Sequence, residues 1–250
     1  MEVKEKKSKK EIWKEISRDF WALCCELGLW WFPQKVVFDQ TDENEREPLM
    51  KEVDGTAKSE EKTLPEDAKV QKKKVGMFYY AEDKSFSEEL IPNKTVSGVV
   101  GYVDETGVHG LIVLLHQKLL FWANAGLFFD MPNGLSGKEN TRLILNVAKD
   151  NWIAAEAAEY CAEYAVDGVK TGEAFLPSID ELKSLYGNKT LINAKLALIK
   201  GADLFNDWYY WSSSEFSVDY AWYQYFSTGF VGKNHHSKCS GGYVCPVVAF

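Results

Sequence analysis

The chain lacks a long apolar run and is poor in proline and glycine. Its 250 residues include no uninterrupted apolar stretch of about 18, which is roughly the length that a membrane-spanning helix needs. Its 7 prolines and 18 glycines are too few for a collagen-like or proline-rich chain. We therefore expect a globular protein without a transmembrane segment.

Cysteines and basic residues are also scarce. The 5 cysteines are an odd number, and Cys24 and Cys25 are neighbours, so they do not indicate a disulfide framework. Lys and Arg number 29 against 37 Asp and Glu, which makes the net charge −8. Because nucleic-acid binding relies on a basic footprint for the phosphate backbone, we expect no nucleic-acid partner.

The amino-terminal region shows no recognisable export signal. Its most apolar stretch, residues 20–32, contains Glu26 and is not followed by small residues suited to cleavage. Trp21 and Leu23 stand where a lipoprotein site would have small residues before Cys24. The sequence predicts synthesis in the cytoplasm and leaves the final location open, including association with a cell surface or a virion.

Aromatic residues are abundant, and they divide the chain into three parts. They make up 14% of the residues, yet none occurs in residues 39–74, where about half of the residues are charged. Such a segment buries too little apolar surface to offset the entropy of ordering it. The sequence thus predicts an amino-terminal region (1–38), a flexible charged linker (39–74) and a globular domain (75–250).

The amino-terminal region contains a predicted amphipathic helix over residues 10–31. Its apolar residues are spaced three and four apart in a heptad pattern, and Pro33 ends it. Three roles stay open: docking on its own domain, self-association, or attachment to a membrane surface or another partner. The apolar stripe consists of Trp13, Ile16, Phe20, Leu23, Leu27 and Trp30.

The globular domain is predicted to be α+β, because its helical segments are bracketed by strands rather than alternating with them. Thr141 or Asn140 is expected to cap the first helix, and a capping box at 178–181 opens the third. Gly168 and Gly201 are expected to end the second and fourth helices. Strands are predicted at 75–80, 95–103, 109–116, 208–214, 220–226 and 243–250, and helices at 138–149, 152–165, 178–186 and 190–200.

Five strings in this domain together resemble a known bacterial family. Residues 175–182 read Phe-Leu-Pro-Ser-Ile-Asp-Glu-Leu, and residues 210–215 read Tyr-Trp-Ser-Ser-Ser-Glu. With three further strings, they are similar to the domain of unknown function at the carboxyl terminus of Legionella collagen-like proteins, which also occurs in Fibrobacter-type paralogous surface proteins. The further strings lie at 98–103 with 109–111, at 221–223 with 227–229, and at 246–250.

The resemblance implies a C-type-lectin-like domain, in which two helices pack on a small twisted antiparallel sheet. Formylglycine-generating enzymes and the variable proteins of diversity-generating retroelements share that fold. The resemblance further implies that the last strands and their loops present the ligand-binding face, and diversification of this segment by a retroelement is a hypothesis. Cys245 stands where the family has an arginine, so the bidentate hydrogen bonds of a guanidinium are lost there.

The candidate ligand-binding face lies between residues 216 and 243. Tyr, Ser, Asn and His are frequent there, and such residues supply rigid amphipathic area and adaptable hydrogen bonds, as in antibody paratopes. The alternative interpretation is a set of ordinary loop residues and half-buried sheet aromatics. The candidate residues for a protein or glycan ligand are Phe216, Asp219, Tyr220, Trp222, Tyr223, Tyr225, Lys233, Asn234, His235, His236, Lys238 and Tyr243.

The histidines and cysteines of this segment do not predict a metal or catalytic site. His235 and His236 are adjacent, and adjacent strand residues point to opposite faces, so they are poorly placed to share a ligand. Cys239 and Cys245 invite comparison with the cysteine pair of formylglycine-generating enzymes, but the surrounding strings match the other branch of the fold. Residues 206–207 are interpreted as a turn rather than as part of a calcium site, and we expect no cofactor.

The sequence therefore favours a non-enzymatic ligand-binding module. Two alternatives stay open: a structural or assembly subunit of a surface appendage or virion, and, less favoured, an oxidase of the formylglycine-generating type. None of the residues named above specifies the ligand.

Overall fold

The computed structural model describes residues 72–250, apart from residues 125, 127, 130–133 and 135. The predicted helix at 10–31 and the predicted linker up to residue 71 lie outside the described residues. Within the described part of the chain, no helix is both long and apolar enough to cross a bilayer.

The described residues contain two five-stranded sheets. Neighbouring strands of the first sheet are antiparallel, and in the second sheet only β6 and β9 pair in parallel. The first sheet has the order β10 (Val247–Ala249), β4 (Gly110–Leu114), β3 (Gly98–Val103), β1 (Phe78–Tyr80) and β2 (Ser85–Ser87). The second has the order β5 (Lys118–Phe121), β9 (Gly241–Val244), β6 (Tyr209–Glu215), β7 (Ala221–Tyr225) and β8 (Val231–Gly232).

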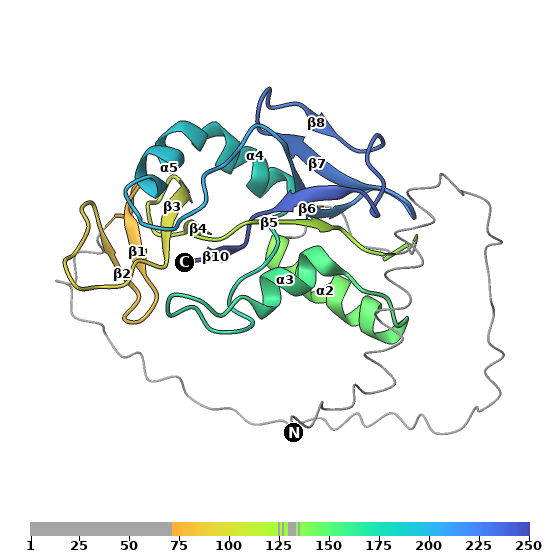
Figure 1. The fold of residues 1–250 in the computed structure, drawn as a ribbon, viewed down its shortest axis with the longest axis horizontal. Coiled ribbons are helices and arrows are strands. Elements are labelled where there is room, and N and C mark those ends of the chain that lie inside the picture. The colour runs from red at the N-terminus through yellow and green to blue at the C-terminus, as the bar shows by residue number, and fades with distance from the viewer. Residues whose placement is uncertain (1–71, 125, 127, 130–133, 135) are drawn as a thin grey trace, which may run out of the picture.

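Four helices of the described residues lie on two sides of these sheets (Figure 1). Helices α2 and α3 contact β6 and β5 on one side of the second sheet, whereas α4 contacts β6 and β7 and, together with α5, β3 of the first sheet. The predicted α+β class is confirmed at this level. The helices are α2 (Gly137–Asp150), α3 (Glu156–Glu163), α4 (Ile179–Gly187) and α5 (Lys189–Leu196).

Two of the helices begin with capping boxes. The prediction for α4 is confirmed, because Ser178 Oγ accepts from the Glu181 N–H and the Glu181 carboxylate accepts from the Ser178 N–H at 2.7 Å. Helix α2 begins with the same motif at Ser136. The predicted caps Thr141 and Asn140 are wrong, because both lie buried inside α2, after its first residues.

Two helices are shorter than the sequence pattern predicts. Trp152 has a left-handed backbone, with a φ of +58°, which a right-handed helix cannot contain, so α3 begins after it. The extended backbone of Tyr164 ends α3. Gly168 and Gly201 both have positive φ, but each lies several residues beyond the end of its helix.

The predicted carboxyl-terminal strand is divided between the two sheets. Its first half, β9, pairs with β5 and β6, and its second half, β10, pairs with β4. Cys245 and Pro246 lie between the halves. Pro246 has no N–H to donate to a ladder, and its carbonyl accepts from the Leu114 N–H at 3.1 Å. This crossing joins the two sheets covalently.

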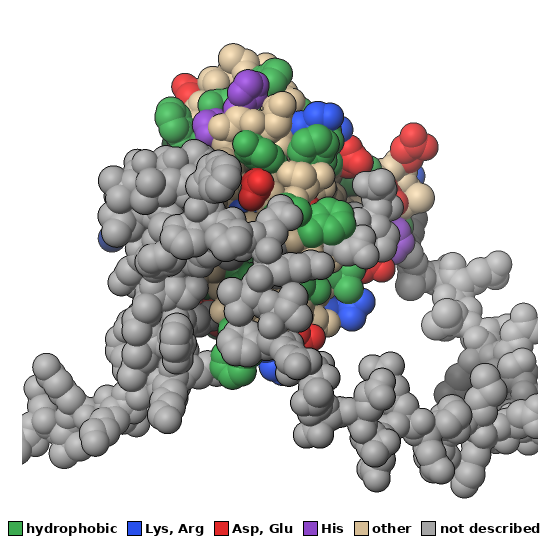
Figure 2. Space-filling view, turned by 90° about the vertical axis from the view of Figure 1, so that its right-hand side faces the viewer, with side chains coloured by type: hydrophobic (Ala, Val, Ile, Leu, Met, Phe, Trp, Pro, Cys, Tyr) green, Lys and Arg blue, Asp and Glu red, His purple; other side chains and the backbone are tan. Residues whose placement is uncertain are grey.

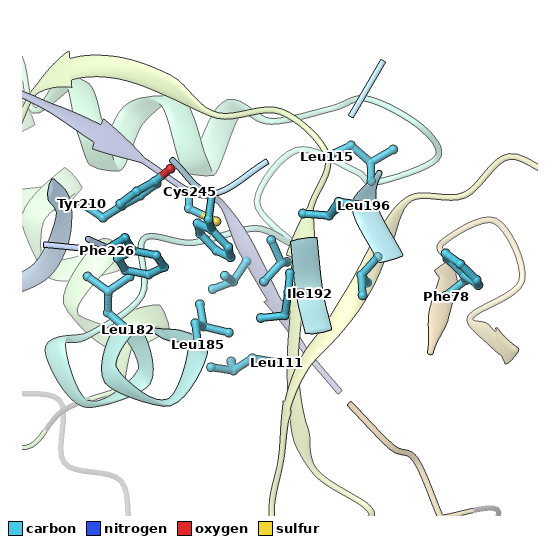
Figure 3. Close-up of a cluster of buried hydrophobic side chains, with 14 of the residues drawn as sticks. Phe78, Leu111, Leu115, Leu182, Leu185, Ile192, Leu196, Tyr210, Phe226 and Cys245 are labelled. Carbon is cyan, nitrogen blue, oxygen red and sulfur yellow. The ribbon is translucent and has the colours of Figure 1, made fainter. Parts of the chain in front are cut away.

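The main hydrophobic core lies between the sheets and helices α4 and α5. Figure 3 shows aliphatic side chains from both helices beside Tyr210 of β6 and Leu111 of β4. Full burial of one such side chain contributes about 1.5–3 kcal/mol. The buried members are Phe78, Tyr80, Val96, Val99, Leu111, Val113, Leu115, Phe175, Leu182, Leu185, Ile192, Leu196, Phe205, Tyr210, Phe226, Cys245 and Val247.

A second core lies between the second sheet and helices α2 and α3. Alanines of α3 let that helix approach closely, and large aromatic side chains of the sheet fill the remaining space. Because both faces of the second sheet are covered by helices, its accessible side chains lie at its ends and edges. The buried members include Trp122, Phe129, Ile144, Ala157, Ala158, Cys161, Tyr209, Trp211 and Tyr223.

Candidate ligand-binding surface

The register of β6 and β7 decides which side of the sheet each aromatic residue occupies. Tyr209 lies opposite Tyr225, and Trp211 lies opposite Tyr223. Side chains alternate along a strand, so these four point to the face that packs on α2 and α3. Trp222, which directly precedes Tyr223 in β7, points to the other face. The candidate residues predicted from sequence therefore do not form one continuous face.

Tyr223 belongs to the buried side of this arrangement. Its side chain is fully buried, and its ring meets the edge of the Trp211 ring at 5.8 Å between centroids. Gly232 of β8 lies opposite Tyr223, and a Cβ atom at that position would overlap the tyrosine ring. Tyr223 therefore positions strand β8 and is not available to a ligand.

One end of the sheet exposes an aromatic row, which we define as Trp208, Tyr225 and Phe230. The side chains of Trp208 and Phe230 are 51% and 54% exposed, and Tyr225 is half-buried. The Trp208 ring lies 6.5 Å from that of Tyr225. The Tyr225 N–H donates to the Phe230 carbonyl at 2.9 Å, which holds the hairpin between β7 and β8. Trp208 and Phe230 are absent from the residues predicted by sequence.

His236 attaches the loop after β8 to the same end of the sheet. Its imidazole stacks on the Tyr209 ring at 4.0 Å with an interplanar angle of 11°, and its Nε2 lies 2.9 Å from the Tyr225 hydroxyl. Partial burial, followed by the neighbouring His235, lowers the pKa of His236. The neutral imidazole is therefore favoured, and His236 forms part of the wall of this surface.

A second accessible group lies at the other end of β7, and we call it the Lys233 cluster: Phe216, Trp222 and Lys233. Phe216 is 40% exposed, and its ring meets the edge of the Trp222 ring at 5.7 Å. The Lys233 ammonium lies over both rings, 4.5 Å and 5.2 Å from their centroids. Figure 2 views the molecule from the side of β7 and β8, where hydrophobic, histidine and lysine side chains gather in the upper part.

Lys238 is buried and serves the framework instead of the surface. Its ammonium lies 2.5 Å from the Glu215 carboxylate, and the two side chains are 1% and 3% exposed. Glu215 also accepts from the Phe129 N–H at 3.0 Å, and the ammonium lies 4.8 Å from the centre of the Trp122 ring. Desolvation lowers the pKa of Lys238, against the opposing effect of Glu215.

Glu215 is not among the residues predicted from the sequence, although it is the last residue of the recognised string at 210–215. Its role depends on Lys238, which lies 23 residues further along the chain. The Lys238 backbone adds to the attachment, because its carbonyl accepts from the Trp122 N–H at 2.8 Å and its N–H donates to the Asp219 carbonyl at 2.8 Å. The loop between β8 and β9 is therefore held at Lys238.

The remaining candidates differ in accessibility. Asp219, Asn234 and His235 are exposed, and Tyr220 is half-buried and forms an isolated bridge with Ser237. Tyr243 is also half-buried, and it packs against the main core with its ring 5.6 Å from that of Tyr210. The accessible candidates thus lie around the loop ends, while Tyr223 and Lys238 are interior.

Cys161 and Cys245 are buried and have the character of core residues, whereas Cys239 is partly exposed. Burial raises the pKa values of the Cys161 and Cys245 thiols, which disfavours the thiolate that metal binding requires. Across the described residues, no group of three or more His, Cys, Asp or Glu side chains is placed to hold a metal ion.

Residues 206–207 form the predicted turn. The Asn206 side-chain oxygen accepts from the Trp208 N–H at 2.8 Å, which is the geometry of an Asx turn. The Asp207 carboxylate pairs with Lys189 at 2.8 Å. This turn places Trp208 at the start of β6, at the exposed end of the aromatic row.

Comparison with known proteins gives a similarity of fold only. No family model matches the chain, and no curated protein matches it. A solved fimbrial protein from Bacteroides ovatus ATCC 8483 is similar, with a TM-score of 0.56 and 17% sequence identity. The match covers 71% of this chain and 49% of that protein, so this chain spans about half the length of the fimbrial protein it matches. At 17% sequence identity, the match shows a similar fold and nothing more.

Proposed function

We propose that the globular domain is a non-enzymatic binding module, whose protein or glycan ligand contacts the exposed aromatic side chains of β6, β7 and β8. One observation carries this proposal. Trp208, Phe216 and Phe230 are each at least 40% exposed, although they flank strands in which most of the aromatic side chains, Tyr209, Tyr210, Trp211 and Tyr223, are buried. Exposed aromatic side chains on a rigid support are typical of the residues that dominate binding energies.

The support beneath these side chains is stiff. Buried rings hold β6 and β7 together, His236 is stacked on Tyr209, and the Glu215–Lys238 ion pair holds the following loop. A preorganised surface loses little conformational entropy when it binds. This rigidity favours recognition by a fixed shape over adaptation of a mobile segment.

We further propose that the arrangement is a C-type-lectin-like fold whose exposed loops vary around a constant framework. In support, parts of the recognised strings are interior: residues 210–213, Ala221 and Val247 are fully buried. The most exposed candidates lie between them. Diversification by a retroelement predicts a near-repeat of the coding region for residues 210–250 beside a reverse transcriptase gene. If no such near-repeat exists, the binding module is a receptor whose loops do not vary.

The test is a screen of the full chain on glycan and protein arrays, followed by substitution. The double variant Trp208→Ala/Phe230→Ala should lower affinity for a captured ligand by about tenfold or more. Leu198→Ala is the matched control, because Leu198 is 60% exposed and lies near α5, away from β7 and β8. Equal binding by the double variant and the parent chain would reject this surface.

A subunit of a surface appendage is the second candidate, and the fold shared with a fimbrial protein is the observation in its favour. Such a subunit should self-associate or join a partner subunit. Light scattering of the full chain over a wide concentration range should then report a mass that rises above that of one chain. A mass equal to that of one chain at every concentration would reject the hypothesis of self-assembly.

A further inference from the structure

The Lys233 ammonium is held over two aromatic faces, as described above. A cation at this distance from a ring centre is attracted by the ring quadrupole. The two rings therefore hold the lysine tip in one place at the start of the loop, where β8 ends. A positive charge is thus preorganised at the edge of the proposed binding surface.

Five other described lysines lie over rings, and two of them, Lys94 and Lys238, also pair with a carboxylate. Lys94 lies 4.7 Å from the centre of the Tyr80 ring and 2.5 Å from the Asp83 carboxylate. Lys238 lies over Trp122 and has Glu215. Among the described residues, by contrast, no carboxylate lies within 4.0 Å of the Lys233 ammonium.

Asp219, the acidic residue on the turn between β6 and β7, does not supply the missing charge. Asp219 points its carboxylate toward Gly126, since a Cβ atom at Gly126 would lie 2.6 Å from Asp219 Oδ1. Two apolar side chains near this turn are exposed, Val218 at 37% and Phe216 at 40%. The surroundings of the Lys233 charge are therefore apolar, and a charge-assisted hydrogen bond is stronger there than in open water.

We propose that the ligand is a protein that places an Asp or Glu carboxylate on Lys233 and an adjacent apolar side chain on Phe216 and Val218. This inference rests on the proposed binding function. Charge complementarity favours an acidic group on the partner. The combination of an aliphatic and an aromatic side chain beside the lysine favours a protein over a sugar, because it offers contact area without hydrogen-bonding groups for hydroxyls.

A phage-displayed library of random peptides, selected on the full chain, tests the inference. Selected peptides should be enriched in Asp or Glu next to Phe, Leu or Ile. Lys233→Gln should weaken their binding by about tenfold, whereas Lys233→Arg should stay within about threefold of the parent chain, because the cation is kept. Lys118→Gln is the matched control, since Lys118 also lies over a ring, that of Tyr160.

The outcomes separate this inference from the proposed function. Peptides without acidic enrichment that bind through Trp208 would overturn the inference and keep the binding function. Binding of sulfated or uronic-acid glycans through Lys233, with no peptide selected, would overturn the assignment to a protein. A chain that binds neither peptides nor glycans would overturn both proposals.

Discussion

The two ends of the loop between β8 and β9 carry the same kind of residue in opposite roles. Lys238 is buried, and its charge is matched by Glu215. Lys233 is held by rings and meets no carboxylate among the described residues. The loop is therefore attached to the framework at Lys238 and presents a positive charge at Lys233. The presence of a lysine in the predicted binding segment therefore does not by itself make that lysine a ligand contact.

The largest effect is expected at the buried end. Glu215→Leu leaves the Lys238 ammonium buried without its carboxylate, and removal of one partner of a buried pair destabilises by about 3–5 kcal/mol. Unfolding by urea measures the loss. The double variant Glu215→Leu/Lys238→Met should lose much less, because no buried charge remains. Equal losses in the single and double variants would contradict the assigned role of the pair.

A smaller effect is expected from His236, in the middle of the loop. Burial lowers its pKa in the folded chain, so the unfolded chain takes up a proton more readily below about pH 6.5. Stability should therefore fall as the pH drops through that value, and continue to fall to the folded-state pKa. Denaturant unfolding of the parent chain and of His236→Phe on both sides of that pH should show a shallower dependence in the variant.

The smallest effect on stability is expected at the exposed end. Lys233→Gln removes a partly exposed interaction between a cation and two rings, which is worth about 0.5–1 kcal/mol. The same urea titration measures it. A loss as large as that of Glu215→Leu would erase the distinction between the two ends of the loop and assign Lys233 to the framework.

Local chemistry made several features predictable from the sequence. The capping box at Ser178 needs only residues within one turn, and it is confirmed. The apolar strands around 98–103 and 110–114 are likewise found. Strands β2, β5 and β8 were not predicted, because they are two to four residues long and carry no clear alternation of apolar and polar side chains.

The candidate site was predictable in its location but not in its members. The aromatic residues of segment 216–243 indicated a surface near the end of the second sheet, and several of them are accessible there. Trp208 and Phe230 lay outside the predicted set, because one precedes the segment and the other stands in a turn. The pairing of β6 with β7 brings Trp208 beside Tyr225, and the hairpin between β7 and β8 brings Phe230 there.

Composition, capping signals and apolar spacing were sufficient for the α+β class and for the capping box at Ser178, because each depends on neighbours within a few residues. Tertiary structure alone decided the buried ion pair of Lys238 with Glu215 and the placing of Trp222 and Tyr223 on opposite faces of the sheet. It also decided that the chain passes from one sheet to the other at Pro246. These depend on strand register and on contacts between residues distant in the chain, which no local pattern records.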